Sequence, residues 1–215
     1  MASPTDAVVA IHNAFRHDIA LIDTAALESA RGARGLDTTV ERFRFLSEVL
    51  EWHAHGEDAA ILPLLESVAP SVYETYAHDH RALDAAFDAL HEAVSSRDAL
   101  ATARATNVCR FHLHLHLDKE DAHMYRIISE RVSVPEQAQA MGIMGSHAPQ
   151  DRFPEIVAWM FPLIGLEDRV NMTRAWQTSM PPEGFAFATH LIEQVVRDEW
   201  PAIARHIPEL TAAAF

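Results

Sequence analysis

The chain has 215 residues, of which 49% are hydrophobic and 22% are charged, so it is long enough and apolar enough to bury a sizeable core. Its 17 basic and 31 acidic residues give a formal charge of -14, which argues against nucleic-acid binding and against binding to anionic membranes. The single cysteine, Cys109, excludes an intrachain disulfide, and since we recognise no signal peptide or long apolar run, we expect a soluble, cytoplasmic protein.

Scarce glycine and a long proline-free stretch predict long helices rather than short strands. We expect four of them, over about residues 5–29, 38–68, 71–95 and 98–131. Pro63 predicts a kink or a broken turn in the second helix. Residues 111–117 alternate as a strand would, but they lie in a segment without proline or glycine, so we interpret them as helix. Long helices with short connections predict an all-α fold, an antiparallel four-helix up-down bundle over residues 5–134.

Residues 135–215 are expected to form a C-terminal helical extension, because prolines divide this part into shorter helices. We expect these helices near residues 154–164, 167–179 and 184–206. Five of the seven methionines and three of the four tryptophans lie between Met141 and Trp200. Because so much apolar surface must be covered, we expect the extension to pack on the bundle or to form a homodimer contact.

Histidine is unusually frequent in this chain. There are 14 histidines, and most of them lie between His12 and His123. Histidine is the commonest metal-ligating side chain and has little reason to accumulate in an apolar core. Metal binding is therefore the first hypothesis.

The bundle sequence contains an internal duplication. Residues 53–59 and 116–122 both read H-x-x-x-E-D-A, and the helix before each of these segments contains a matching histidine, His12 or His80. Residues four apart on a helix point the same way, with Cβ atoms about 5–6 Å apart. Each H-x-x-x-E pair therefore presents an imidazole and a carboxylate to one point in the bundle interior.

Four imidazoles and two carboxylates converge in this arrangement. They belong to His12, His53, Glu57, His80, His116 and Glu120. The set suits a pair of first-row metal ions, each held by two histidines, with Glu57 and Glu120 free to bridge them. Mixed nitrogen and oxygen donors favour iron over calcium or magnesium and leave open positions for small molecules.

At these residues the sequence resembles the hemerythrin-like (HHE cation-binding) family, most closely its bacterial members, over roughly residues 5–134. The resemblance implies a hemerythrin-type bundle whose six residues ligate a non-haem di-iron centre, two Fe ions with an oxo or hydroxo bridge. It also implies an oxidoreductase-like function with O2, hydrogen peroxide or nitric oxide. The sequence departs from the oxygen-carrying hemerythrins of marine worms, whose third helix is similar to an HxxxH pattern. Here Tyr76 stands four residues before His80 and Asp84 four after it, which argues against reversible oxygen carriage.

Two questions stay open at this point. A fifth protein ligand could be Tyr76, Asp84 or His112, and Tyr76 is also the candidate catalytic residue, because it lies one turn from His80 on the inward stripe. The alternative is that Tyr76 is a core residue whose hydroxyl forms a hydrogen bond outside the site. The alternative function is an iron- or oxygen-sensing or storage module without turnover. A purely structural metal site is disfavoured, because such sites usually use closed, Cys-rich tetrahedra.

Overall fold

The computed structural model describes residues 4–207 and 210, and every regular element in this part of the chain is a helix, which confirms the predicted all-α fold. The first elements are α1 (Asp6–Ala30), α2 (Asp37–Gly56), η1 (Glu57–Ile61), α3 (Leu62–Val68), α4 (Pro70–Ser96), α5 (Ala99–Lys119), η2 (Glu120–Met124) and α6 (Tyr125–Arg131). They are followed by α7 (Val134–Ser146), η3 (Gln150–Arg152), α8 (Phe153–Leu163), α9 (Leu166–Ser179), α10 (Pro182–Val195) and α11 (Trp200–Arg205). Within the described residues, no helix combines the length and the apolar composition needed to cross a bilayer.

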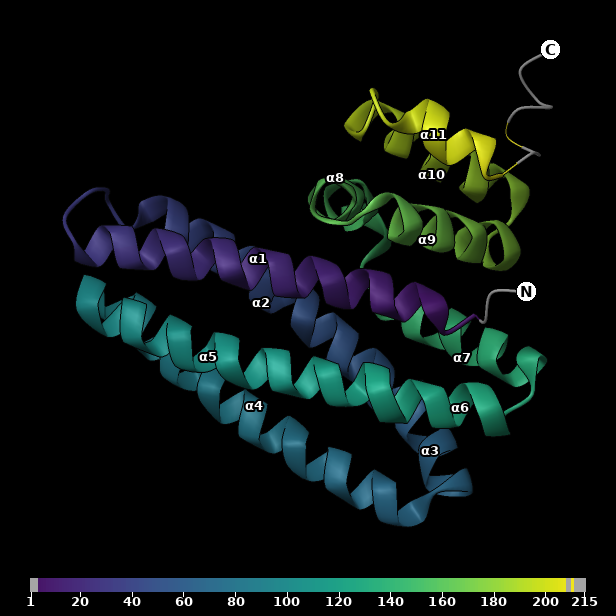
Figure 1. Cartoon of the computed structure of the whole chain (residues 1–215), viewed down its shortest axis with the longest axis horizontal. Coiled ribbons are helices and arrows are strands. Elements are labelled where there is room, and N and C mark those ends of the chain that lie inside the picture. The colour runs from purple at the N-terminus through teal and green to yellow at the C-terminus, as the bar shows by residue number, and fades with distance from the viewer. Residues whose placement is uncertain (1–3, 208–209, 211–215) are drawn as a thin grey trace.

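Four long helical segments form the bundle: α1, α2 with α3, α4, and α5 with α6 (Figure 1). Consecutive segments run in opposite directions in Figure 1, which follows from the short connections between them. Helix α5 lies between α1 and α4 and packs most extensively against both. The terminal helices α8 to α11 lie outside the bundle, on the side of α1.

Two apolar clusters fill the bundle interior, one on each side of the duplicated motif. The first cluster lies toward the 31–36 loop and includes the buried side chains of Phe15, Ile19, Phe43, Leu46, Leu113 and Leu117. The second lies toward α3 and α6 and includes Ile61, Leu65, Met124 and Ile128. Full burial stabilises each of these side chains by roughly 1.5–3 kcal/mol. The polar residues of the motif thus lie in a short section between two apolar clusters.

Each copy of the motif contains a π-helical turn that begins at its glutamate. The Leu62 amide donates to the Glu57 carbonyl, and the Tyr125 amide donates to the Glu120 carbonyl, both across five residues. The sequence predicted a kink or a broken turn at Pro63 in the second helix and an unbroken fourth helix. Pro63 lies in the first turn of α3, directly after the π turn that interrupts the second helix, whereas the π turn in the fourth helix was not predicted. π turns inside α-helices are rare and frequently occur at functional sites.

The C-terminal extension packs on the bundle in two places. Helix α7 covers η1, and its start is fixed by a capping box between Ser133 and Glu136. Helices α8 to α11 form a third apolar cluster, which buries the small side chains of Ala7, Ala10 and Ala14 on the outer face of α1. The division of the chain at residue 134, and a homodimer through the extension, stay predictions.

Candidate metal centre

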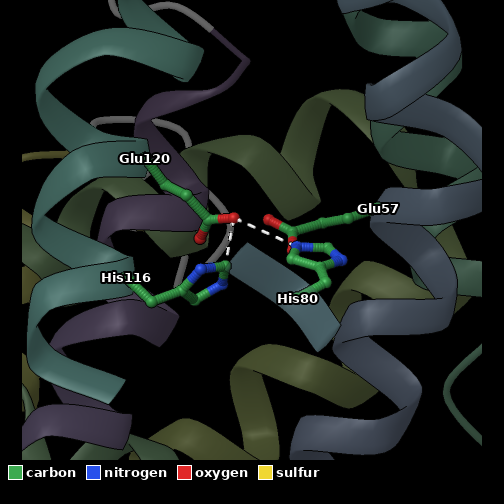
Figure 2. A group of neighbouring side chains, drawn as sticks. All are labelled: Glu57, His80, His116 and Glu120. Carbon is green, nitrogen blue, oxygen red and sulfur yellow. Dashed lines mark hydrogen bonds and ion pairs between the residues drawn. The ribbon is translucent and has the colours of Figure 1, made fainter. Parts of the chain in front are cut away.

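The structure brings the six residues selected by the sequence into one buried cluster in the middle of the bundle. They come from α1 (His12), α2 (His53), η1 (Glu57), α4 (His80), α5 (His116) and η2 (Glu120). The cluster divides into two groups that share Glu57, and within each group the potential ligand atoms lie within 4.8 Å of one another. Figure 2 shows the larger group, in which side chains from α4, α5, η1 and η2 point toward one another.

Each carboxylate faces both histidine pairs. Glu57 Oε1 lies 3.3 Å from His53 Nε2, and Glu57 Oε2 lies 3.8 Å from His80 Nε2. Glu120 Oε1 lies 3.1 Å from His116 Nε2, and Glu120 Oε2 lies 3.7 Å from His12 Nε2. Both carboxylates therefore span the space between the pairs, as a bridging ligand must.

The polar atoms of the cluster fit a bound cation. The Nε2 atoms of His12 and His53 lie 3.0 Å apart. When the Nδ1 atom of a neutral imidazole carries the proton, its Nε2 atom presents a lone pair, which is what a metal ion binds. Glu120 Oε2 is buried without a hydrogen-bond partner among the described residues. A buried polar atom without a partner is costly, and a metal ion would satisfy such groups. The donor set of four imidazoles and two carboxylates suits first-row transition metals, iron among them.

The aspartate of each motif copy contacts the lone histidine of the other hairpin. His12 Nδ1 lies 2.7 Å from Asp121 Oδ1, and His80 Nδ1 lies 3.4 Å from Asp58 Oδ1. A carboxylate on one ring nitrogen fixes the proton there and directs the other nitrogen toward a metal. Both aspartates belong to the duplicated motif H-x-x-x-E-D-A, but the sequence analysis predicted no role for them. The recurrence of aspartate directly after each glutamate was the signal available for finding them.

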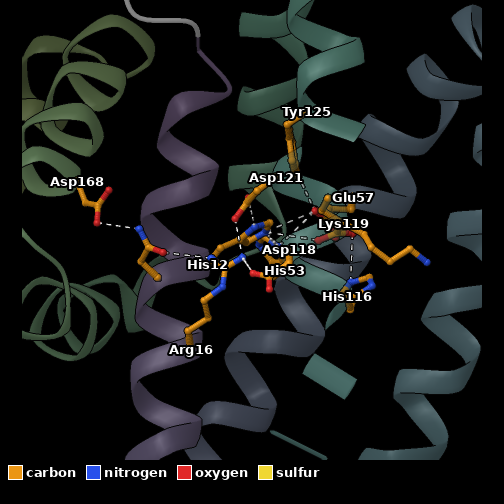
Figure 3. A network of polar contacts seen from close by, with 12 residues as sticks. His12, Arg16, His53, Glu57, His116, Asp118, Lys119, Asp121, Tyr125 and Asp168 are labelled. Carbon is orange, nitrogen blue, oxygen red and sulfur yellow. Dashed lines mark hydrogen bonds and ion pairs between the residues drawn. The ribbon is translucent and has the colours of Figure 1, made fainter. Parts of the chain in front are cut away.

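Arg16 extends the contact at His12 into a network that reaches the extension (Figure 3). Its guanidinium donates to Asp121 Oδ2 at 2.6 Å and to Asn13 Oδ1 at 3.1 Å. The Asn13 amide in turn donates to Asp168 on α9 at 2.9 Å. Helix α9 is thereby connected to His12 through side-chain hydrogen bonds alone.

The buried charges shift one another's protonation. Burial alone would lower the pKa of His80, but its hydrogen bond to Glu120 and the charge of Glu57 raise that pKa to about 9. Burial alone would raise the pKa of Glu120, but the charge and the hydrogen bond of His116 hold it well below its usual range. In the absence of metal, His80 therefore carries a proton beside the ionised carboxylate of Glu120. A cation that binds there replaces this proton.

Two tyrosines lie beside the cluster. The hydroxyl of Tyr76 donates to the Lys119 carbonyl at 2.5 Å, so in this structure it binds backbone at the π turn, and its proposed catalytic role stays a prediction. Tyr125, which the sequence did not single out, donates to Glu57 Oε1 at 2.5 Å. Burial, with the charge of Glu57, raises the pKa of Tyr125, so its hydroxyl keeps the proton that it donates.

The other two candidates for a fifth ligand lie away from the two groups. Asp84 is exposed and lines the groove between α2 and α4, whereas His112 is half-buried on α5, next to Phe111. Neither belongs to the two potential metal-holding groups among the described residues.

A groove between α2 and α4 connects the cluster to the surface. Its volume is about 820 Å³, and His53, Glu57, His80 and His116 lie at its inner end. The outer part is lined mainly by charged side chains, among them Arg44, Glu48, Glu51, Asp58, Arg81, Asp84 and Asp88. Small molecules and hydrated cations have a polar route to the site.

Comparisons with known proteins identify the family of the chain. The family model described as the hemerythrin HHE cation-binding domain matches residues 3–128, more than half of the chain. The chain is also 24% identical, over 201 residues, to the zinc finger protein BRUTUS of Arabidopsis thaliana. That similarity covers 90% of this chain, and so reaches into the extension, but only 16% of the plant protein. No solved structure matches significantly. The chain belongs to the hemerythrin HHE cation-binding domain family, and its His and Glu side chains form a candidate metal site.

Proposed function

We propose that this chain binds two iron ions at the cluster and uses them to handle O2, hydrogen peroxide or nitric oxide. The observation that supports the proposal is that Glu57 and Glu120 each face both histidine pairs, because such an arrangement would allow each carboxylate to bridge two cations. When bound, the iron ions would supply the electrons that these small oxidants accept.

The chain's own residues would hold and shield that centre. His12 and His53 would bind one ion and His80 and His116 the other, while both glutamates would bridge. The Tyr125 hydroxyl donates a hydrogen bond to Glu57 Oε1 and orients this carboxylate. The two apolar clusters exclude water from both ends of the site, and the groove between α2 and α4 admits small molecules from the side.

Metal analysis with an optical spectrum tests the centre. Protein purified from iron-supplemented cells should contain about two irons per chain and should absorb in the near ultraviolet, as bridged ferric pairs do. The His55→Ala variant is the matched control, because His55 is exposed and lies only two residues from His53 on the same helix. It should keep both irons, whereas His53→Ala should lose at least one. Stoichiometric zinc without iron in the wild-type protein would contradict the proposal.

Steady-state consumption of hydrogen peroxide separates catalysis from the alternative function. The iron-loaded protein should consume peroxide faster than the same concentration of free iron. If two irons are bound but turnover does not exceed that of free iron, the chain is better described as a sensing or storage module.

A further inference from the structure

The two histidine pairs have different surroundings, although the sequence motif that produces them is duplicated. The His12 side chain is 0% exposed, and its partner Asp121 is 21% exposed. Asp121 is held in turn by Arg16, which Asn13 and Asp168 connect to α9 (Figure 3). The whole contact is thus fixed by residues from α1, η2 and the extension.

The corresponding contact of the second pair is looser. The His80 side chain is 13% exposed, and Asp58 lies 3.4 Å from its Nδ1 atom with 56% of the aspartate side chain exposed. No ion pair or hydrogen bond of the described residues holds Asp58 in the way that Arg16 holds Asp121. His80, His116 and Asp58 line the groove between α2 and α4, as does His53 of the first pair, whereas His12 and Asp121 do not. The histidine–aspartate contact of the second pair thus lies on the groove, and that of the first pair does not.

We propose that the two metal positions are inequivalent: the His12–His53 position binds the first ion tightly, and the His80–His116 position binds the second ion more weakly and exchanges it through the groove. The inference rests on the proposed function, since it requires two metal positions. A buried carboxylate on Nδ1 increases the basicity of the imidazole and fixes the ring in its ligating orientation before the metal arrives. An exposed, longer contact does both to a smaller extent, because water competes for the carboxylate.

The acidic lining of the groove fits a cation route to the second position. Glu51, Asp58, Asp84 and Asp88 line it, against Arg44 and Arg81. A surplus of negative charge along a cleft raises the local concentration of cations. The His12 side chain lies at the closed end and does not line the groove.

The duplicated aspartates supply a matched pair of variants for a test. Metal-free full-length protein is titrated with Fe²⁺ alone under anaerobic conditions, and binding is followed by calorimetry. Wild-type protein should bind two ions in two steps whose affinities differ at least about tenfold. Asp121→Asn keeps the side-chain size but removes the charge, and it should weaken the first step by about 10–100-fold. Asp58→Asn should leave the first step unchanged and weaken only the second, by less than about tenfold.

Histidine variants assign the steps to the positions. His80→Ala should keep one ion with the wild-type affinity of the first step, whereas His12→Ala should lose that step. Circular dichroism and thermal unfolding verify that each metal-free variant is folded. Should Asp121→Asn fail to fold, Arg16→Gln replaces it, and it should weaken the first step in the same direction because Asp121 then loses its cation.

The outcomes distinguish this inference from the proposed function. Two ions bound with one common affinity, or equal losses in the two aspartate variants, would overturn the inequivalence and leave the two-iron centre standing. A tight step that survives His12→Ala and disappears in His80→Ala would overturn the assignment in the same way. Wild-type protein that binds no Fe²⁺, or only one ion, would overturn the proposed function itself.

Discussion

Gly56, the residue directly before Glu57, lies against Met144 on α7 of the extension. A Cβ atom at this position would lie 2.7 Å from Met144 Cγ and 3.1 Å from both the Cα and the carbonyl oxygen of Met144 on α7. Met144 Cγ is flexible, but its backbone atoms cannot move without shifting α7. Replacing glycine by alanine inside a helix would by itself stabilise the protein by about 0.5–1 kcal/mol. Forced overpacking costs about 1–3 kcal/mol, so we expect Gly56→Ala to destabilise the protein on balance.

Thermal unfolding of metal-free protein measures this effect. In a chain of this size, 1 kcal/mol corresponds to about 2–4 °C in Tm, so Tm should fall by a few degrees. Gly142→Ala is the control, because Gly142 lies inside α7 with no atom within 4 Å of the added Cβ, and it should raise Tm slightly. Gly56→Ala should also weaken iron binding, since displacing α7 or η1 moves Glu57. A Gly56→Ala variant as stable as Gly142→Ala would refute the close packing of α7 on η1.

Four further predictions concern the site and the extension. Glu57→Ala and Glu120→Ala should each reduce the content of both irons, because each carboxylate faces both histidine pairs; a variant that keeps two irons and an unchanged spectrum would contradict bridging. Tyr125→Phe should destabilise metal-free protein by about 1.5–3 kcal/mol in denaturant unfolding, because it removes a hydrogen bond to a buried charge. Metal-free protein should lose up to about 3 kcal/mol as pH rises from 6.5 through 9, because folding raises the pKa of His80 from 6.5 to about 9; an unfolding free energy that does not change over this range would contradict the shift. A chain that ends near residue 134 should aggregate or melt earlier, yet bind two irons in its soluble fraction, because the six proposed ligands precede that boundary.

The long helices and the six clustered side chains could be predicted because both depend on one period. Spacings of three and four along a helix place apolar residues on one stripe, and the same spacing places His53 with Glu57 and His116 with Glu120. Histidine in such numbers, on an otherwise apolar stripe, has few explanations besides a ligand. The His and Glu residues that follow the helical period could therefore be predicted from the sequence alone.

The features that were missed depend on departures from that period. In an unbroken helix, the residue four after Glu120 is Met124, and it would take the inward position beside the site. The π turn inserts one residue, so Tyr125 reaches Glu57 instead. Helix α7 was missed because its apolar pattern is weak, although Ser133 and Glu136 carried a capping signal for its start.

The duplicated motif explains both the symmetry of the ligands and the asymmetry of their surroundings. Within H-x-x-x-E-D-A the ligands are fixed, but the position before glutamate differs: it is Gly56 in the first copy and Lys119 in the second. Gly56 admits α7 against the first π turn, whereas Lys119 pairs with Asp79 on α4 and offers its carbonyl to Tyr76. One copy is thus covered by the extension and the other is tied to α4. Both copies still reach the groove, the first through His53, Glu57 and Asp58 and the second through His116. Divergence at this one position therefore changes what supports each glutamate from behind, not its access to the groove.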